Sequence, residues 1–301
     1  MIALKEFATG LQVRRQELAK TGVDIPSIGL GTWRYEGGVD PLRAAIDLGA
    51  AFIDTAESYG TEEIVGQAIQ ARRKDVFVAT KVAPRHFRYS EIIDAANRSL
   101  KRLGTDYIDL YQLHWPNYAV PIEETMAAME ELVKSGKVRF IGVSNFMARD
   151  LRTAERAMSR ERIVSNQIRY NLIDRTVEND LIEYCQKQGL TLIAHSPLAS
   201  DIASIQARDP ENVLEKLAKA RSASVAQIAL AWCLSKGGVV AIPRASSAGH
   251  VRDNCAASEI RFSTSELEML NTKIRFRRRS SIEIGLRRLA RHALQMTGRN
   301  Q

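Results

Sequence analysis

Eight short runs of β-favouring residues recur along the chain, separated by stretches long enough to hold a helix. Apolar residues at helical spacing fill two of these stretches, at residues 90–103 and 122–136. Neighbouring strands joined by such long connections pair in parallel, so the alternation predicts a parallel sheet covered by helices. The expected strands are residues 28–33, 51–56, 76–82, 108–114, 138–145, 165–171, 190–197 and 239–243.

Two parallel architectures fit this alternation: an open, doubly wound sheet and a closed (β/α)8 barrel. A doubly wound dinucleotide-binding sheet would need a third glycine after its first strand, but Trp33 and Arg34 follow Gly29 and Gly31. Eight units within about 250 residues favour the barrel. We therefore predict the α/β class and a single-domain (β/α)8 TIM barrel over residues 1–274.

An N-terminal β-hairpin is expected ahead of the first barrel strand. Residues 4–25 contain turn signals at Thr9-Gly10 and Thr21-Gly22. We expect this hairpin to cap the N-terminal mouth of the barrel.

Composition indicates a globular chain. Of 301 residues, 45% are hydrophobic and 26% are charged, which excludes a disordered or collagen-like chain. No long uncharged apolar run predicts a membrane span, and the first residues lack the apolar segment of a secretory signal. Cys185, Cys233 and Cys255 lie far apart, so we expect neither a disulfide framework nor a zinc ribbon, and we predict a reducing cytoplasm.

The positive charge is concentrated in the C-terminal tail. The net charge is +8, and residues 275–301 hold eight Arg and one Glu, which leaves +1 for residues 1–274. Residues 1–274 do not have the strongly basic composition of a nucleic-acid-binding domain, so we expect no nucleic-acid partner.

The same tail, residues 275–301, is predicted to form a basic amphipathic helix. Ile282, Leu286, Leu289 and Ala293 share helical spacing, while Arg287, Arg288 and Arg291 lie on other faces. Such a helix can rest on an anionic membrane or another acidic surface. The alternative is a terminal helix packed on the barrel with a solvated Arg face.

Three charged or polar residues interrupt strands that should be buried and apolar. Asp54, Lys81 and His114 lie near the C-terminal ends of three consecutive expected strands. Those ends meet at the mouth where barrel enzymes carry their active sites, and Tyr59 lies in the loop that follows Asp54. Taken singly, the Lys–Asp pair and the His also fit structural roles in the core. Together they predict one cluster.

A Tyr beside a Lys suggests proton donation. An ammonium favours the phenolate and so lowers the pKa of Tyr59, while Asp54 holds Lys81 charged. His114 is suited to hydrogen-bond and orient a carbonyl oxygen. The five His residues show no metal-ligand spacing, so no metal is expected. Carbonyl protonation without a metal requires a hydride donor, which implies a nicotinamide.

Several blocks resemble the aldo-keto reductase superfamily in their order and content. The most specific are DTAESYGTE at residues 54–62 and LKRLGTDYIDLYQLHWP at residues 100–116, and the likeness extends over about residues 22–261. The resemblance implies reduction of aldehydes or ketones to alcohols with NADPH. It also implies that Asp54, Tyr59, Lys81 and His114 form a catalytic tetrad, with Tyr59 as the general acid.

The resemblance also assigns cofactor contacts, grouped by the part of the cofactor they would meet. They are Gly31, Thr32, Trp33 and Asp54 near the nicotinamide, Ser144, Asn145 and Gln167 at its carboxamide, His195 stacked on its ring, Ser196, Pro197 and Leu198 beside the pyrophosphate, Arg244, Ala245 and Ser246 at the adenosine 2′-phosphate, and His250, Asp253 and Asn254 at the adenine. The family commonly has Tyr at position 195, and many members have Arg at position 250. NADPH is therefore expected, with NADH left as an alternative.

An aromatic-walled substrate pocket is expected at the same mouth. Its expected residues are Trp33, Tyr59, Phe87, His114 and Trp115. Phe87 also fits simple packing against the barrel. The short loops after Lys81 and His114 suggest an open pocket for a broad range of small carbonyl compounds, in a monomer or small homo-oligomer. The alternative function is an NADP(H)-binding regulatory module with little turnover, recruited to a surface through its basic tail.

Overall fold

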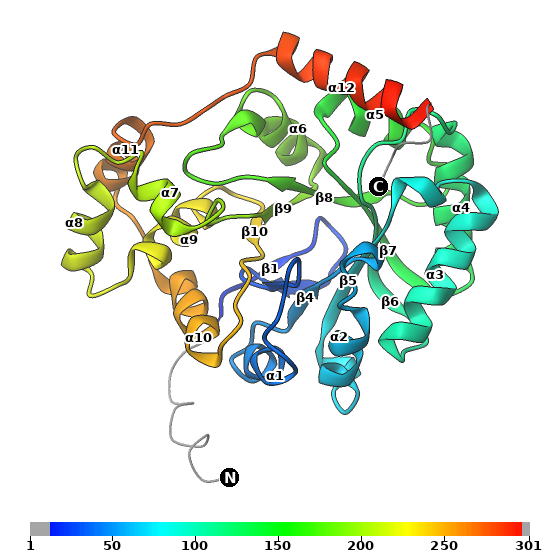
Figure 1. The fold of residues 1–301 in the computed structure, drawn as a ribbon, viewed down its shortest axis with the longest axis horizontal. Coiled ribbons are helices and arrows are strands. Elements are labelled where there is room, and N and C mark those ends of the chain that lie inside the picture. Colours follow the sequence, from blue (N-terminus) through cyan, green and yellow to red (C-terminus); the bar gives the residue numbers. More distant parts are fainter. Residues whose placement is uncertain (1–12, 297–301) are drawn as a thin grey trace.

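A central set of strands enclosed by helices forms the body of the protein (Figure 1). The structure, a computed structural model, describes residues 13–296. The strands are β1 (Arg15–Glu17), β2 (Asp24–Pro26), β3 (Leu30–Gly31), β4 (Phe52–Asp54), β5 (Phe77–Val82), β6 (Ile108–Leu113), β7 (Val138–Ser144), β8 (Ile163–Arg169), β9 (Thr191–His195) and β10 (Val239–Ala241). 

Helices connect these strands and cover the outside of the sheet. The α-helices are α1 (Asp40–Asp47), α2 (Glu62–Ile69), α3 (Tyr89–Leu103), α4 (Ile122–Lys134), α5 (Ala148–Arg156), α6 (Leu181–Gln188), α7 (Ile202–Gln206), α8 (Val213–Ala220), α9 (Val225–Leu234), α10 (Ala248–Ala256), α11 (Thr264–Thr272) and α12 (Ser281–Met296). The 3-10 helices are η1 (Glu57–Tyr59), η2 (Arg73–Asp75), η3 (Pro84–His86), η4 (Thr176–Glu178) and η5 (Ala257–Glu259).

The eight strands from β3 to β10 form one parallel sheet in chain order. A parallel bridge between Ile28 and Ala241 joins the two ends, where Gly29 N donates to Ala241 O at 2.9 Å. A Cβ on Gly31 would lie 2.8 Å from Ile242 O, so close contact of the closing strands requires glycine there. The predicted (β/α)8 barrel is confirmed.

The N-terminal hairpin is also confirmed. Strands β1 and β2 pair antiparallel, and Gly22 takes a positive φ of 74° in the turn between them. Leu18 and Ile25 are buried in the apolar cluster that fills the barrel interior, and Ala19 N donates to Thr191 Oγ1 at the start of β9. The hairpin therefore covers the N-terminal mouth. The turn expected at Thr9-Gly10 lies outside the described residues.

Some element boundaries differ from the expected ones. The strand expected at 165–171 is β8, residues 163–169, because the buried Ile163 and Val164 extend its start. It ends early because Asn171 enters a turn, where its N–H and carbonyl pair with those of Asp174. The helix expected at 122–136 ends at Lys134, and Gly136 follows with a φ of 74°.

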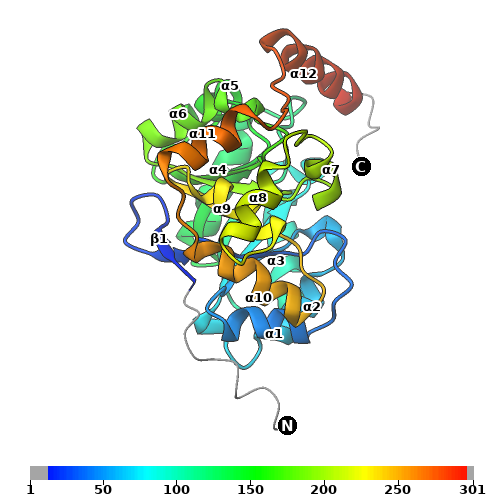
Figure 2. The same cartoon turned by 90° about the vertical axis from the view of Figure 1, so that its left-hand side faces the viewer.

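The chain after α11 crosses to the loop that follows β8. Arg277 N donates to Ile173 O and Arg175 N donates to Arg277 O, both at 2.9 Å. Helix α12 then lies at the periphery of the molecule (Figure 2). Within residues 13–296, no helix has the length and apolar character needed to cross a membrane.

Candidate active site

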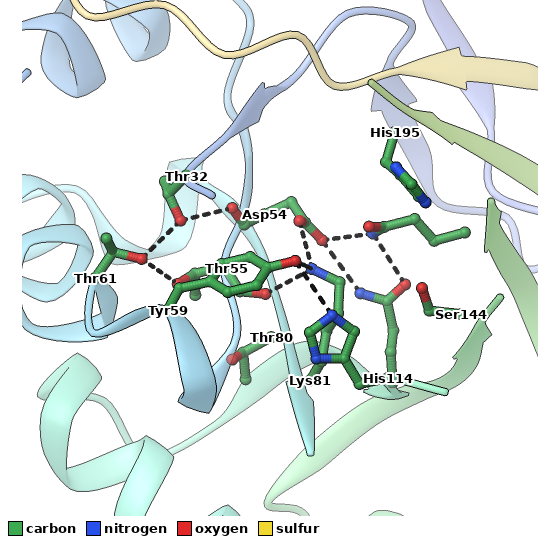
Figure 3. A network of polar contacts seen from close by, with 12 residues as sticks. Thr32, Asp54, Thr55, Tyr59, Thr61, Thr80, Lys81, His114, Ser144 and His195 are labelled. Atoms are coloured by element: carbon green, nitrogen blue, oxygen red, sulfur yellow. Dashed lines mark hydrogen bonds and ion pairs between the residues drawn. The ribbon is translucent and has the colours of Figure 1, made fainter. Parts of the chain in front are cut away.

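Four polar side chains from three strand ends and one loop meet at the C-terminal mouth of the barrel (Figure 3). Asp54 ends β4, Lys81 lies in β5, His114 follows β6, and Tyr59 ends η1. Lys81 Nζ lies 2.6 Å from Asp54 Oδ2 and 3.4 Å from the Tyr59 hydroxyl. The Tyr59 hydroxyl lies 3.3 Å from His114 Nε2. The structure thus brings together all four residues that the sequence places at one mouth.

The ammonium of Lys81 is fully buried, and its surroundings compensate for that burial. Besides the Asp54 carboxylate, it donates to Thr55 O at 2.8 Å. The third neighbour is the Tyr59 hydroxyl. A buried charge is costly unless it is paired and hydrogen-bonded, and these partners meet that condition. The ammonium is therefore held in one place, directed at Tyr59.

Two buried amides hold the other carboxylate oxygen of Asp54. Gln112 Nε2 and Gln167 Nε2 donate to Asp54 Oδ1 at 3.2 and 2.6 Å. Gln112 Oε1 also accepts from Gln167 Nε2 at 3.3 Å. This arrangement leaves Oδ2 for Lys81 and fixes the carboxylate plane.

Gln112 was not predicted from the sequence. Its signal was an amide inside a fully buried strand, two residues before His114. Because side chains alternate along a strand, Gln112 and His114 point to the same face. In β6 that face is the barrel interior, where Gln112 is fully buried.

The loop that carries Tyr59 is anchored to the neighbouring loop. Glu57 Oε1 accepts from Ala83 N and lies 3.0 Å from His86 Nδ1, so η1 is joined to the turn after β5. A second anchor is a row of hydroxyls in which Thr61 Oγ1 lies 2.8 Å from both Thr32 Oγ1 and Thr55 Oγ1. These contacts position η1, and the roles of Glu57 and Thr61 in it were not predicted from the sequence.

Burial and charge act in opposite directions on Tyr59. Burial raises the pKa of Tyr59, the nearby Lys81 lowers it, and the net shift is upward. The expected net lowering is therefore wrong for this site, because desolvation outweighs the ammonium. The phenol stays protonated at neutral pH. For Lys81, burial lowers the pKa, but Asp54 and Tyr59 raise it further, so the ammonium stays charged.

Two imidazoles at the mouth are neutral near physiological pH. Burial, with a contribution from Lys81, lowers the pKa of His114 to about 3. Burial likewise lowers the pKa of His195 to about 3. A neutral imidazole can donate one hydrogen bond and accept another, which suits His114 to a polar substrate atom.

The residues expected at the nicotinamide carboxamide form a chain of hydrogen bonds across strand ends. Asn145 Nδ2 donates to Ser144 Oγ and to His114 O, both at 3.0 Å. His195 Nε2 lies 3.2 Å from Asn145 Oδ1, and its Nδ1 lies 3.2 Å from Ser196 Oγ. Gln167 instead points to Asp54. Ser144, Asn145 and His195 therefore line one edge beside the four central residues.

The residues expected at the 2′-phosphate lie at the start of α10. Arg244 and Ser246 are exposed, Ala245 is buried, and Arg244 Nη1 donates to Arg34 O at 2.6 Å. His250 is exposed in the first turn of the helix, whose N-cap is Ser247. An exposed guanidinium and hydroxyl beside backbone N–H groups form a donor set suited to a phosphate.

The remaining residues expected at the cofactor are buried, half-buried or hydrogen-bonded within the protein. Ser224 Oγ donates to Asp253 Oδ2 at 2.9 Å, and Asn254 is buried. Pro197 is buried and Leu198 half-buried after β9. Thr32 is buried and donates to Asp54 O at 3.0 Å.

Of the expected pocket residues, Trp33 and Trp115 are exposed and Phe87 is buried. Trp33 and Trp115 are 54% and 37% exposed. Phe87 is 1% exposed and belongs to the main core, which favours the packing role left open for it. The guanidinium of Arg34 lies 4.5 Å from the Trp33 ring centroid, and that of Arg291, from α12, lies 4.0 Å from the Trp115 centroid. Within the part of the chain that the structure describes, no cluster of His, Cys, Asp and Glu is arranged to hold a metal.

Comparisons with known proteins agree on one family. The family model of the Aldo/keto reductase family matches residues 27–275. Methylglyoxal reductase YeaE of Escherichia coli (strain K12) is 40% identical over 260 residues, covering 83% of this chain and 91% of that protein. 

Solved structures give the same result. A thermostable aldo-keto reductase, Tm1743, crystallised with the inhibitor epalrestat, has a TM-score of 0.81 and 44% identity, covering 86% of this chain and 99% of its own. An aldo/keto reductase from Klebsiella pneumoniae in complex with NADP and acetate has a TM-score of 0.79 and 40% identity, covering 86% and 95%.

Proposed function

The chain belongs to the aldo/keto reductase family, and from this membership we propose that it reduces small, reactive aldehydes and ketones, with dicarbonyl compounds such as methylglyoxal among its substrates. Its general reaction is the NADPH-dependent reduction of a carbonyl group to an alcohol. The finer substrate class is supported by the relative named as a methylglyoxal reductase. The exposed rings of Trp33, after β3, and Trp115, after β6, offer apolar contact surface to a small substrate.

Tyr59 is the proposed proton donor, and the contact between its hydroxyl and Lys81 carries this assignment. When bound, NADPH supplies a hydride to the carbonyl carbon. The carbonyl oxygen then takes the proton of the Tyr59 hydroxyl, and the phenolate that remains is stabilised by the ammonium 3.4 Å away. Proton uptake from solvent restores the phenol. The charge that develops on Tyr59 is thus met by a cation already in place.

Lys81, Asp54 and His114 have separate proposed roles. Lys81 stabilises the phenolate, and Asp54 holds Lys81 charged and fixed. His114, neutral and 3.3 Å from the Tyr59 hydroxyl, hydrogen-bonds the substrate carbonyl oxygen and orients it.

The residues of this chain fit an NADP(H) molecule. Arg244, Ser246 and the start of α10 would hold a phosphate, because they offer exposed donors at a helix N-terminus. Ser144 and Asn145 would hold the carboxamide, since amide and hydroxyl groups match its donor and acceptor. His195 would lie against the nicotinamide ring. Three free cysteines, all buried, support a reducing, cytoplasmic setting.

NADPH consumption tests the proposal. Purified protein is mixed with NADPH and a panel of methylglyoxal, other short aldehydes and simple ketones, and oxidation is followed by absorbance. We expect methylglyoxal to rank among the better substrates. Turnover of bulky ketones with none of methylglyoxal would contradict the substrate class. Tight NADPH binding with no oxidation even in a single turnover would instead favour a regulatory binding module.

A further inference from the structure

Helix α12 packs its polar side against the barrel. Gln295 Nε2 donates to Pro116 O and Gln295 Oε1 accepts from Tyr118 N, both at 2.8 Å. The Arg291 guanidinium stacks on Trp115, and Arg288 Nε lies 3.5 Å from Asp150 Oδ1.

These docking residues share one side of the helix. Arg288, Arg291 and Gln295 are separated by three and four residues, which is helical spacing. Helix α12 therefore packs on the barrel, as one of the two expected arrangements has it, but Arg288 and Arg291 contact the barrel instead of forming a solvated Arg face.

The opposite side of α12 is an apolar stripe in solvent. Ile282, Leu286 and Leu289 are 77%, 61% and 66% exposed. Ala293 is also exposed, and the four residues recur every three or four positions. At about 100° per residue they lie within one narrow sector, facing away from the docking residues. Soluble proteins seldom expose several large apolar side chains together without a partner.

Exposed cations accompany this stripe. The side chains of Arg277, Arg278 and Arg287 are 53%, 46% and 62% exposed. Glu283, the one acidic residue in a tail of net charge +7, pairs with Arg277 and lies 3.6 Å from Arg287, while Arg278 pairs with Glu178 of the barrel. The tail thus combines an exposed apolar stripe with arginines that outnumber their acidic partners.

We propose that the outward face of α12 binds the surface of an anionic lipid bilayer. Ile282, Leu286 and Leu289 would enter the boundary between headgroups and acyl chains, and the arginines would contact anionic headgroups. The position of α12 at the periphery of the molecule leaves this face accessible (Figure 2).

Charge and area favour a bilayer over a second copy of this chain. Two tails of net charge +7 repel each other, whereas anionic lipid attracts them. A single stripe on a 16-residue helix also offers much less than the roughly 800 Å² per partner that a stable protein interface buries.

Vesicle co-sedimentation tests the proposal on the full-length protein. The vesicles contain phosphatidylcholine alone or phosphatidylcholine with phosphatidylglycerol, at low and high salt. The test variant is Leu286→Glu with Leu289→Glu, and Arg287→Glu tests the charge. Met269→Glu is the matched control, because Met269 is an exposed apolar residue, 38% exposed, on α11 rather than on the stripe. Thermal unfolding and NADPH-dependent turnover establish that every variant is folded.

We expect binding to the anionic vesicles only, weakened by salt. The double variant should lose roughly tenfold or more of this binding, Arg287→Glu should lose less, and Met269→Glu should bind like the wild type. Absence of binding to anionic vesicles at low salt would overturn the proposal. Equal binding to neutral vesicles, or equal binding by the double variant, would also overturn it. If the wild type does not bind vesicles but has twice the monomer molar mass in solution, and the double variant has the monomer mass, the face would be assigned to a second copy of this chain instead.

Discussion

The hydroxyl of Tyr59 lies 3.4 Å from the ammonium of Lys81, although the two residues come from different segments of the barrel mouth. Burial raises the pKa of Tyr59 more than Lys81 lowers it, so the phenol stays protonated in the resting site. The ammonium therefore matters most after the proton has left, when a phenolate must be stabilised. Lys81 acts on the charge that develops during the reaction rather than on the resting phenol.

Replacing Tyr59 with Phe should remove the proton donor and leave the site packed. We expect kcat to fall by about two to four orders of magnitude, the range typical of general acid catalysis. NADPH affinity, measured by fluorescence quenching, should change little. Tyr89→Phe is the control, because Tyr89 is an exposed tyrosine at the start of α3. Turnover near the wild-type level in Tyr59→Phe would contradict the assigned role.

Replacing Lys81 with Met should destabilise the fold as well as abolish turnover. The change leaves the Asp54 carboxylate, 2% exposed, without its cation. We expect the free energy of unfolding to fall by about 3–5 kcal/mol, as for other broken buried pairs. Urea denaturation measures it.

The double variant Lys81→Met with Asp54→Leu completes this test. It should recover part of the lost stability, because no uncompensated charge remains buried. Lys187→Met is the control, since Lys187 and Glu183 form an exposed pair on α6 whose loss should leave stability nearly unchanged. If Lys81→Met proved no more destabilising than this control, the buried pair would not be structurally important.

Gln112 is expected to position Asp54 for the reaction. Gln112→Glu places a second carboxyl beside Asp54, and repulsion between the two raises the pKa of the introduced carboxyl. We expect kcat to fall about tenfold at neutral pH and to recover partly as the pH is lowered and the introduced carboxyl is protonated. The measurement is kcat against pH for the wild type, Gln112→Glu and Gln112→Leu.

The pH profile separates positioning from packing. Gln112→Leu lacks a titrating group, so its kcat should fall without a new pH dependence. A merely structural role would give both variants the same profile as the wild type, and that result would refute the positioning role.

Arg244 should discriminate NADPH from NADH. Its exposed guanidinium lies at the start of α10, where the 2′-phosphate is expected. Losing a hydrogen bond to a charged group typically costs about 1.5–3 kcal/mol, or roughly 10- to 100-fold in affinity. Arg244→Ala should therefore raise the Kd for NADPH by that factor and leave the Kd for NADH unchanged. Parallel fluorescence titrations measure both, and an equal loss for the two cofactors would rule out a 2′-phosphate contact.

The sequence was sufficient to predict the barrel and the meeting of the four central residues. Periodicity identified the strands, and the rule that parallel strand ends share one mouth brought Asp54, Lys81 and His114 together. The direction in which the pKa of Tyr59 shifts could not be predicted from the sequence. Burial raises this pKa and Lys81 lowers it, and the larger of the two effects depends on the folded structure. Gln112 was not predicted because a single amide in a buried strand belongs to no recognisable motif. 

The orientation of α12 was also beyond the sequence. Its pattern predicted an amphipathic helix, but the pattern alone does not say which face contacts the barrel. Docking is decided by particular tertiary partners, Trp115, Tyr118 and Asp150, which attract the arginines and leave the leucines outside.

The neutral imidazole of His195 should make stability depend on pH. Its pKa is about 3 in the fold and 6.5 in the reference state, so the unfolded chain binds the extra proton between these values. The stability due to the neutral form is fully present above pH 6.5 and is lost as the pH falls towards 3. His195→Tyr removes this group and keeps a flat ring. In urea unfolding without cofactor, the wild type should lose stability between pH 7 and 5 more steeply than the variant, by at most about 1.4 kcal/mol per pH unit. Identical slopes for the two proteins would mean that the fold does not favour the neutral form of His195.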